Sequence, residues 1–256
     1  MSEAEAQGVQ NGSAKHDTFL HRIQDGIRGM RKKGGIYREY VEPFLIAAVV
    51  ALFIRQFALE AFKIPSGSMI PTLKIGDHLL VNKFVYGPRI PFTDTRIFAW
   101  KEPKRGEIIV FRYPRDEKKN FIKRVIGLPG DKIQIADGIL MINDQPVALT
   151  EQGYRDDEKN GGFSFTNKAQ LFEERLGAVN HHIQYYREQS SENYGPVIVP
   201  KNNVFVMGDN RDNSADSRVW GFVKYDKILG RALIIYWSWN GNDSWVRWGR
   251  IGSLIR

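Results

Sequence analysis

The feature that most constrains this chain is the charge-free apolar run PFLIAAVVALFI, which extends from Pro43 to Ile54. Its twelve residues are too few for a spanning helix, because such a helix needs about 20. The moderately apolar stretch that continues to Phe62 supplies the remainder, with Arg55 and Glu60 toward its far end. We therefore predict one N-terminal transmembrane anchor over residues 41–63. A buried core helix or a helix lying in the membrane interface is the alternative.

Basic residues on the two sides of this run predict its direction. Five of them precede the run: Arg28, Arg31, Lys32, Lys33 and Arg38. Only two, Lys63 and Lys74, follow it over a comparable distance. Since Lys and Arg favour the cytoplasmic side, residues 1–40 are predicted to be a cytoplasmic basic tail and the rest of the chain to lie across the membrane. No small-x-small cleavage site follows the run, so we do not expect it to be removed.

The distribution of charge also indicates the class of partner. A formal net charge of +8 is compatible with nucleic acid or with an anionic membrane surface. Outside the cluster the basic residues are scattered among acids, and no nucleic-acid-binding motif accompanies them. We expect membrane lipid and no nucleic acid as a partner. Cysteine is absent and the histidines lack ligand spacing, so no metal or organic cofactor is expected.

Beyond the anchor, the sequence is typical of an all-β domain over residues 64–256. Short β-branched and aromatic runs such as GEIIVFRYP, NFIKRVIGL and ILGRALIIYWSW are separated by Gly, Pro, Asn and Asp. Asp137-Gly138 lies between two such runs and predicts a hairpin turn. Between about residues 150 and 195 the chain becomes polar and charged. We predict that this part is an insertion on the surface of the domain.

A serine-containing segment, IPSGSMIPTL, begins at Ile64, directly after the predicted anchor. Two prolines and a glycine restrict its backbone, and a serine in such a loop, Ser68, can present its hydroxyl to an extended peptide. A purely structural turn is the alternative. The histidines are poor candidates for a base, because His16 and His21 precede the anchor and His181 and His182 lie in the insertion. The G-x-S-x-G elbow is absent. Among the histidines, only His78 remains as a candidate base for Ser68. The alternative to a histidine base is a lysine, in a Ser-Lys pair.

Lys123 is the lysine best placed for this task. In an extended strand it shares a face with Phe121 and Val125, whereas Arg124 points to the opposite face. In water, a lysine pKa of about 10.4 leaves roughly one molecule in 2,500 neutral at pH 7. Burial lowers a lysine pKa by up to about 3 to 5 units, which is enough to make a large fraction of the amine neutral at pH 7. An ordinary lysine with a buried stem and an exposed amine is the alternative.

The third segment of interest is GDNRDNSADSR, from Gly208 to Arg218, which follows an apolar run. It concentrates acids, amides and hydroxyls in one short stretch. Such a loop can supply a hydroxyl that orients a lysine amine and Asp-Arg pairs that hold the backbone. An EF-hand calcium loop needs a glycine and a terminal glutamate at set spacings, and these are missing.

Taken together, these segments resemble the bacterial type I signal peptidase family. PSGSMIPTL, GDHLLVNKF, RGEIIVFRYP, FIKRVIGLPGD and GDNRDNSADSRVWGFV occur in the order of that family, from the anchor to near the C-terminus. The resemblance implies a membrane-bound serine endopeptidase that removes signal peptides with small residues at −1 and −3 from secreted preproteins. It also implies a mostly antiparallel β-sandwich or barrel-like catalytic domain on the periplasmic face of the bacterial cytoplasmic membrane.

The resemblance assigns a role to nine residues. It implies that Ser68 is the nucleophile and Lys123 the general base. Ser66 would then contribute to the oxyanion hole and Ser214 would orient the lysine amine. The supporting ion pair would be Asp216 with Arg218. The shallow pockets for substrate would be lined by Ile64, Met69 and Ile122.

The sequence departs from some relatives in two respects. Asn120 and Phe121 stand where those relatives carry aspartate and tyrosine, so Asp209 is the candidate partner for Arg124. Some relatives also carry two spanning helices, whereas only one is predicted here. Two other functions fit the same features: a membrane-tethered β-domain that binds exported chains without cutting them, and a related protease with altered pockets.

Overall fold

The computed structural model describes residues 37–87, 101–156, 168–186, 193–241 and 245–255. The predicted cytoplasmic tail before residue 37, with His16, His21 and four of the five basic residues, lies outside the described residues. The chain divides into two compact units, Met1–Ile54 and Arg55–Arg256. Each unit is described by itself.

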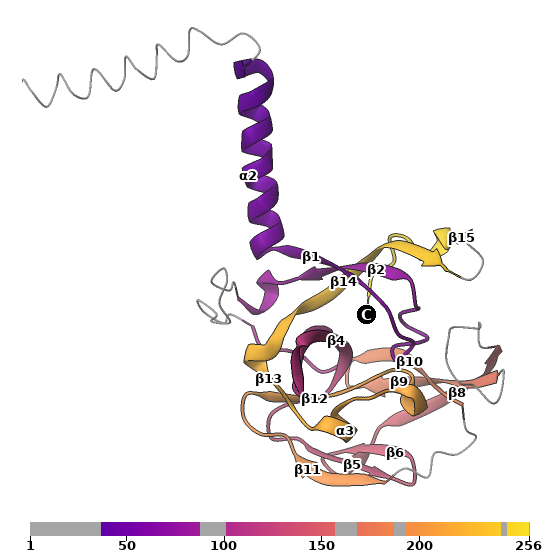
Figure 1. The fold of residues 1–256 in the computed structure, drawn as a ribbon. Helices are drawn as coiled ribbons and strands as arrows, with labels where there is room; N and C mark the ends of the chain where they lie inside the picture. The colour runs from indigo at the N-terminus through magenta and orange to yellow at the C-terminus, as the bar shows by residue number, and fades with distance from the viewer. Residues whose placement is uncertain (1–36, 88–100, 157–167, 187–192, 242–244, 256) are drawn as a thin grey trace, which may run out of the picture. The chain divides into compact units, whose positions relative to one another are not determined.

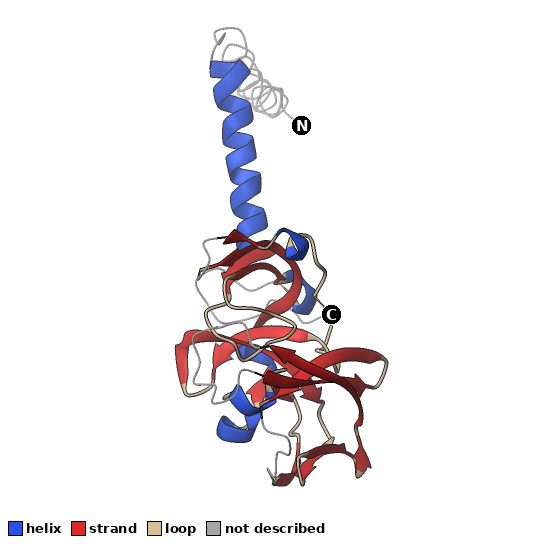
Figure 2. Cartoon of the chain, turned by 90° about the vertical axis from the view of Figure 1, so that its right-hand side faces the viewer, coloured by secondary structure: helices blue, strands red, loops and turns tan. Residues whose placement is uncertain are grey.

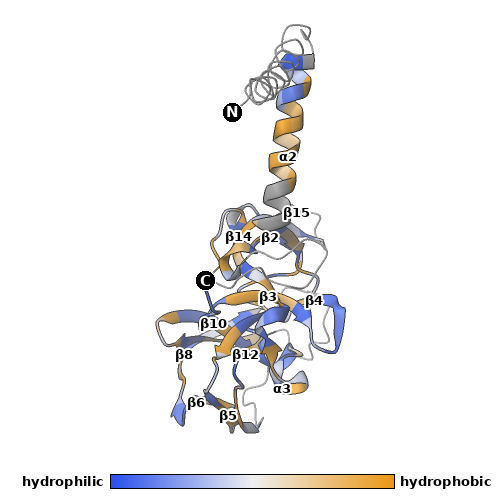
Figure 3. Cartoon of the chain, turned by 90° about the vertical axis from the view of Figure 1, so that its left-hand side faces the viewer, coloured by the Kyte–Doolittle hydropathy of each residue, from blue (hydrophilic) through white to orange (hydrophobic). Residues whose placement is uncertain are grey.

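The first unit contains the π-helical turn η1 (Tyr37–Val41) and most of helix α2 (Glu42–Phe57). Figure 3 shows that the described part of α2 is largely hydrophobic. None of the helices in the described parts of the chain combines the length and the apolar character that crossing a membrane requires.

The predicted helix is wrong beyond Phe57. Leu59–Lys63 forms strand β1, which pairs antiparallel with β2 (Asp77–Asn82) from Leu59↔Asn82 to Lys63↔His78. The edge of β2 supplies hydrogen-bond partners for this backbone, and Phe62 packs against a buried apolar cluster. Pairing and packing therefore give this apolar stretch a more stable place in a sheet than in a longer helix.

The second unit consists mainly of strands, as predicted (Figures 1 and 2). Its eight-stranded sheet has the order β1-β2-β14-β3-β4-β12-β13, and β15 pairs with β14. The other strands of this sheet are β3 (Ile108–Tyr113), β4 (Asp116–Gly127), β12 (Asn203–Met207), β13 (Val223–Lys224), β14 (Ile228–Asn240) and β15 (Trp245–Val246). Neighbouring strands are antiparallel. The sheet is open, because its order ends at β1 and β13.

Two smaller antiparallel sheets complete this unit. The four-stranded sheet has the order β11-β5-β6-β7, with bounds Tyr194–Ile198, Lys132–Ala136, Ile139–Ile142 and Gln145–Pro146. The three-stranded sheet has the order β10-β9-β8, with bounds Val179–Tyr185, Lys168–Leu176 and Ala148–Asp156. The predicted turn at Asp137-Gly138 joins β5 to β6, and both residues have positive φ, 49° and 78°. The short helices are η2 (Phe84–Tyr86), η3 (Arg211–Asn213), α3 (Ser217–Trp220), η4 (Tyr225–Lys227) and η5 (Trp248–Arg250).

The prediction of a surface insertion over residues 150–195 is wrong for β9 and β10. Several of their side chains are buried: Ala169, Glu174, Leu176, His181, Ile183 and Gln184. Leu176 packs in an apolar cluster with residues of β4, β5 and β12. Glu174 and His181 are tolerated there because they lie beside charged groups of other strands and loops, which the local composition does not reveal.

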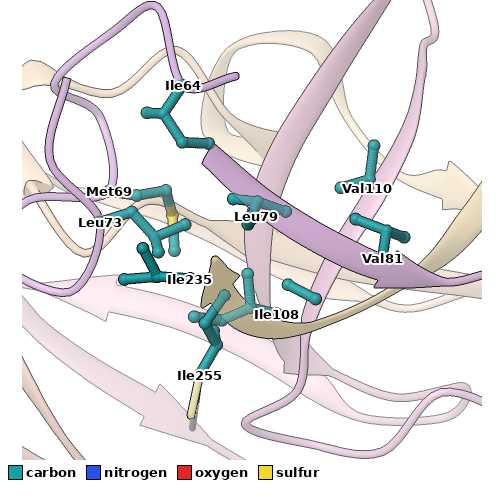
Figure 4. Packing of buried hydrophobic residues seen from close by; sticks show 10 residues of the cluster. Ile64, Met69, Leu73, Leu79, Val81, Ile108, Val110, Ile235 and Ile255 are labelled. Atoms are coloured by element: carbon teal, nitrogen blue, oxygen red, sulfur yellow. The ribbon is translucent and has the colours of Figure 1, made fainter. Parts of the chain in front are cut away.

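Among the described residues, three apolar clusters form the core, and β3 contributes to two of them. Ile108 and Val110 enter the first cluster, whereas Ile109 and Phe111 enter the second. In the first cluster, Met69 and Leu73, from the segment between β1 and β2, lie beside Ile235 of β14 (Figure 4). Fully burying a large apolar side chain contributes about 1.5–3 kcal/mol. The packing therefore fixes the serine-containing segment against the sheet that contains β3 and β4.

Candidate active site

Ser68 lies in the segment between β1 and β2, which is held in place from two sides. Within the segment, the amide of Leu73 donates to Met69 O at 2.8 Å and that of Ile70 donates to Gly67 O at 3.1 Å. From the loop after β12, the backbone amide of Asn210 donates to Ser68 O at 3.1 Å and its Nδ2 donates to Gly67 O at 3.0 Å. The backbone around Ser68 is therefore fixed by a part of the chain about 140 residues away.

Lys123 is brought to Ser68 by strand β4. Its Nζ donates a hydrogen bond to Ser68 Oγ at 2.5 Å, and the lysine is only 3% exposed. The Nζ atom lies 5.7 Å from the centre of the Phe121 ring. Phe121 and Val125 pack in one cluster and Ile122 packs against another, so the strand alternates as the sequence indicated. Lys123 is thus a buried amine in contact with the serine hydroxyl.

Burial lowers the pKa of Lys123 to about 8, although the carboxylates of Asp216 and Asp209 oppose the shift and Arg218 adds to it. Desolvation is the largest cause, because a charged ammonium loses its hydration there. At a pKa near 8, about one molecule in ten carries a neutral amine at pH 7, compared with about one in 2,500 for a lysine in water. The site therefore makes this amine available as a base near neutral pH.

The pH dependence of activity follows from this pKa. A general base works only in its neutral form, so with Lys123 in its predicted role kcat/KM is expected to rise with pH and level off above a midpoint near 8, with about a tenfold loss for each unit below it. Activity measured across pH 5–10 in detergent checks this dependence. A flat profile below pH 7, or a midpoint near that of free lysine, would contradict a buried lysine base.

The segment from Gly208 to Arg218 lies beside this pair. The Asp216 carboxylate accepts hydrogen bonds from Arg218 Nε and Nη2, each at 2.8 Å, and from the amide of Gly208 at 3.0 Å. Burial alone raises the pKa of Asp216, but the hydrogen bonds and charge of Arg218 outweigh it and lower the pKa. Asp216 is therefore an anion at neutral pH, and the ion pair with Arg218 is present.

Arg124, on the other face of β4, is paired with Asp209. Its Nε and Nη2 each donate to the Asp209 carboxylate at 2.8 Å, and its Nη1 donates to Gly106 O at 2.8 Å. The Arg124 side chain is fully buried. Asp209 is thus the partner of Arg124, in place of an acid at position 120. This pair ties the loop after β12 to the strand that carries Lys123.

The serines at positions 214 and 66 lie in different surroundings. Ser214 Oγ is buried, and no hydrogen bond between it and Lys123 is present among the described residues. Ser66 is exposed, and no hydrogen bond between it and Ser68 is present among the described residues. Of the predicted pocket residues, Ile64 and Met69 are buried in the first cluster and Ile122 packs against it.

Two residues of the site had no assigned role in the sequence. Asn210 holds the backbone of Gly67 and Ser68, as described above. A Cβ atom built on Gly208 would overlap both Ser214 Oγ and the carbonyl oxygen of Ser68. The signal for both was the polar segment that begins with Gly208, but the close approach of Gly208 to Ser68 depends on tertiary structure.

A serine hydroxyl bound to a buried lysine amine is the arrangement of a hydrolase with a Ser-Lys pair. The fold places this pair on an antiparallel β-domain, on segments that meet only in the folded chain.

The chain belongs to the signal peptidase family, peptidase S26, whose family model matches residues 37–237. It is 42% identical over 216 residues to signal peptidase I of Pseudomonas fluorescens, covering 78% of this chain and 72% of that relative. It is 40% identical over 215 residues to signal peptidase I of Pseudomonas aeruginosa. It is 37% identical over 245 residues to signal peptidase I of Buchnera aphidicola, covering 80% of this chain and 78% of the relative. The predicted resemblance is confirmed, and the chain is a serine endopeptidase.

Proposed function

We propose that this endopeptidase removes N-terminal signal peptides from secreted preproteins, with Ser68 as the nucleophile and Lys123 as the general base. The observation that carries the assignment is the 2.5 Å hydrogen bond between Lys123 Nζ and Ser68 Oγ in a buried site. Family membership supports the activity, and the lowered pKa of Lys123 supports its role.

The reaction is an acyl transfer. Neutral Lys123 takes the proton of Ser68 Oγ as the oxygen attacks the carbonyl carbon of the scissile peptide bond. The resulting ammonium then gives a proton to the leaving amine, which departs as the N-terminus of the mature protein. Lys123 is neutral again and activates a water molecule, which releases the signal peptide from the acyl-enzyme.

Other predicted residues support these steps. Ser214 orients the amine of Lys123; its hydroxyl is buried and lies, with the carbonyl oxygen of Ser68, against Gly208, which places it near the pair. The Asp216–Arg218 pair holds the loop that carries Ser214. Ser66 contributes a hydrogen bond to the oxyanion, for which its exposed hydroxyl is free to turn toward bound substrate.

The pockets for the −1 and −3 residues of the substrate lie along Ile64, Met69 and Ile122. Ile64 and Met69 already pack against the core, so little depth remains for a substrate side chain. Shallow apolar pockets favour small residues such as alanine. This preference matches the substrate class implied by the resemblance.

The sandwich-like β-domain acts at a membrane surface, with the N-terminus cytoplasmic and residues 64–256 on the periplasmic side of the bacterial cytoplasmic membrane. Several apolar side chains of α2 are exposed, including Phe44, Ile46 and Val49, which supports its role as a single-pass anchor. Trp245 and Trp248 are also exposed, at 68% and 65%. Tryptophan side chains favour the interface between lipid and water, so these two support contact with membrane lipid.

A preprotein with alanine at −1 tests this function. The full chain in detergent is expected to cut it once, and mass spectrometry of the product should place the new N-terminus directly after that alanine. A preprotein with tyrosine at −1 is the matched control and should remain intact. Recovery of both preproteins uncut but bound would instead favour a domain that holds exported chains, and cuts at unrelated sites would favour a protease with other pockets.

A further inference from the structure

The hairpin formed by β9 and β10 contacts the loop after β12, and the mechanism above gives this contact no role. The amide of Gln184 donates to Asp209 O at 2.9 Å, and Gln184 forms an isolated bridge with Asn210. The amide of Tyr186 donates to the Asp212 carboxylate at 2.9 Å. Strand β10 thus lies along the same loop whose Asn210 holds the backbone of Ser68.

A buried ion pair joins the hairpin to this loop. Glu174 of β9 accepts hydrogen bonds from Arg211 Nη1 at 2.7 Å and Arg211 Nη2 at 2.5 Å. The two residues are 0% and 2% exposed. Burial raises the pKa of Glu174, but the Arg211 guanidinium, together with the neighbouring His181, outweighs it, and the pKa falls to about 2. Both groups are therefore charged throughout the working pH range, in a two-point geometry that fixes orientation.

The Glu174–Arg211 pair is the main contact between charged groups of the hairpin and the loop, because the neighbouring His181 is neutral. His181 Nε2 lies 3.2 Å from Glu174 and 3.8 Å from Asp209. Burial lowers the pKa of His181 although Glu174 opposes the shift, so the ring is neutral at pH 7 and above. Arg211 is thus the cation that neutralises Glu174 there.

Arg211 also forms hydrogen bonds within the loop from Gly208 to Arg218. Its Nε donates to Gly208 O at 3.2 Å, and its own carbonyl oxygen accepts from Arg218 Nη2 at 2.7 Å. Arg218 in turn binds Asp216, which accepts from the amide of Gly208. A closed set of hydrogen bonds therefore runs from Arg211 around both ends of the loop.

We propose that Glu174 is a positioning residue: through Arg211 it holds the loop from Gly208 to Arg218 in the form that places Ser214 and Asp216 beside the Ser68–Lys123 pair. The inference rests on the proposed function, since the loop matters only if that pair is the catalytic one. The hairpin then has a task in catalysis, although none of its residues touches substrate.

Glu174→Gln in the full chain tests this role. The change keeps the side-chain shape and removes the charge, so the loop from Gly208 to Arg218 loses its ion pair with the hairpin. Because misplacement by about 1 Å costs on the order of 10²-fold in rate, kcat should fall by that amount with KM little changed. Looser packing also admits water to Lys123, so the midpoint of the pH profile should move upward toward that of free lysine. Glu174→Asp, which keeps the charge, should recover part of kcat.

Glu173→Gln is the matched control, because Glu173 is the neighbouring residue of β9 and is not buried. It should leave kcat and the pH midpoint unchanged. A folded Glu174→Gln variant with a lower melting temperature but the wild-type kcat and pH midpoint would show that the pair only stabilises the fold, and would overturn the proposal.

If Glu174→Gln does not fold, a double variant tests the same role. Glu174→Gln/Arg211→Gln leaves no unpaired buried charge, so this variant should fold and should remain slow. Wild-type kcat in this double variant would overturn the proposal. Ser68→Ala distinguishes failure of the proposed function from failure of the role of Glu174. If Ser68→Ala cleaves normally, the proposed function is refuted. If Ser68→Ala is inactive and Glu174→Gln has wild-type activity, only the role of Glu174 is refuted.

Discussion

Lys123→Ala is expected to lower kcat for preprotein cleavage by about 10⁴-fold, the upper range for loss of a general base, and Ser68→Ala should be at least as damaging. The amine and the hydroxyl act as a unit, so removing either leaves the other without its partner. Lys123→Arg should fail as well, because a guanidinium does not lose its proton in proteins. Single-turnover cleavage in detergent measures all three variants.

Lys119→Ala is the matched control for this experiment. Lys119 lies on the same strand, but its side chain is 68% exposed and pairs with Asp116. Its removal should leave kcat within about twofold, since exposed ion pairs contribute little. Full activity of a folded Lys123→Ala variant would refute the assignment of the base, whatever the behaviour of the control.

Gly208→Ala is the second change with a large expected effect. The added methyl group would overlap Ser214 Oγ and the carbonyl oxygen of Ser68. The Ser68 carbonyl belongs to the backbone and is held by Asn210, so it does not move freely. One of the two segments must therefore shift, and a displacement of about 1 Å costs on the order of 10²-fold in kcat. Steady-state cleavage, with circular dichroism to check the fold, measures this effect.

Gly249→Ala provides the comparison, because a Cβ atom at Gly249 meets nothing within 4 Å. It should cleave at the wild-type rate. A Gly208→Ala variant with unchanged kcat would mean that the approach of this loop to Ser68 is looser in solution than in the structure described above.

The roles of Ser68 and Lys123 could be predicted because five ordered segments of the chain resemble one family. Local pattern adds that period-two alternation places Lys123 and Arg124 on opposite faces of a strand. The strands could be predicted from local pattern as well, since their β-branched and aromatic runs are bounded by turn residues.

The parts that could not be predicted depend on contacts between distant residues. The stretch at Leu59–Lys63 is apolar enough to continue a helix, and only the edge of β2 makes it a strand. Glu174 and His181 look like surface residues by composition, and their contacts with each other, with Arg211 and with Asp209 make their burial tolerable. Such pairings join residues 28 to 37 positions apart or more, and no short pattern encodes them.

Ser68 and Lys123, the proposed nucleophile and base, lie 55 positions apart in the chain, and they meet only when β2, β14, β3 and β4 have joined one sheet. Before that, Lys123 is hydrated and keeps its proton, and Ser68 is an ordinary alcohol. A nascent or partly folded copy therefore has no means of cutting the polypeptides around it. Proteolytic capacity is therefore expected to appear only together with tertiary structure.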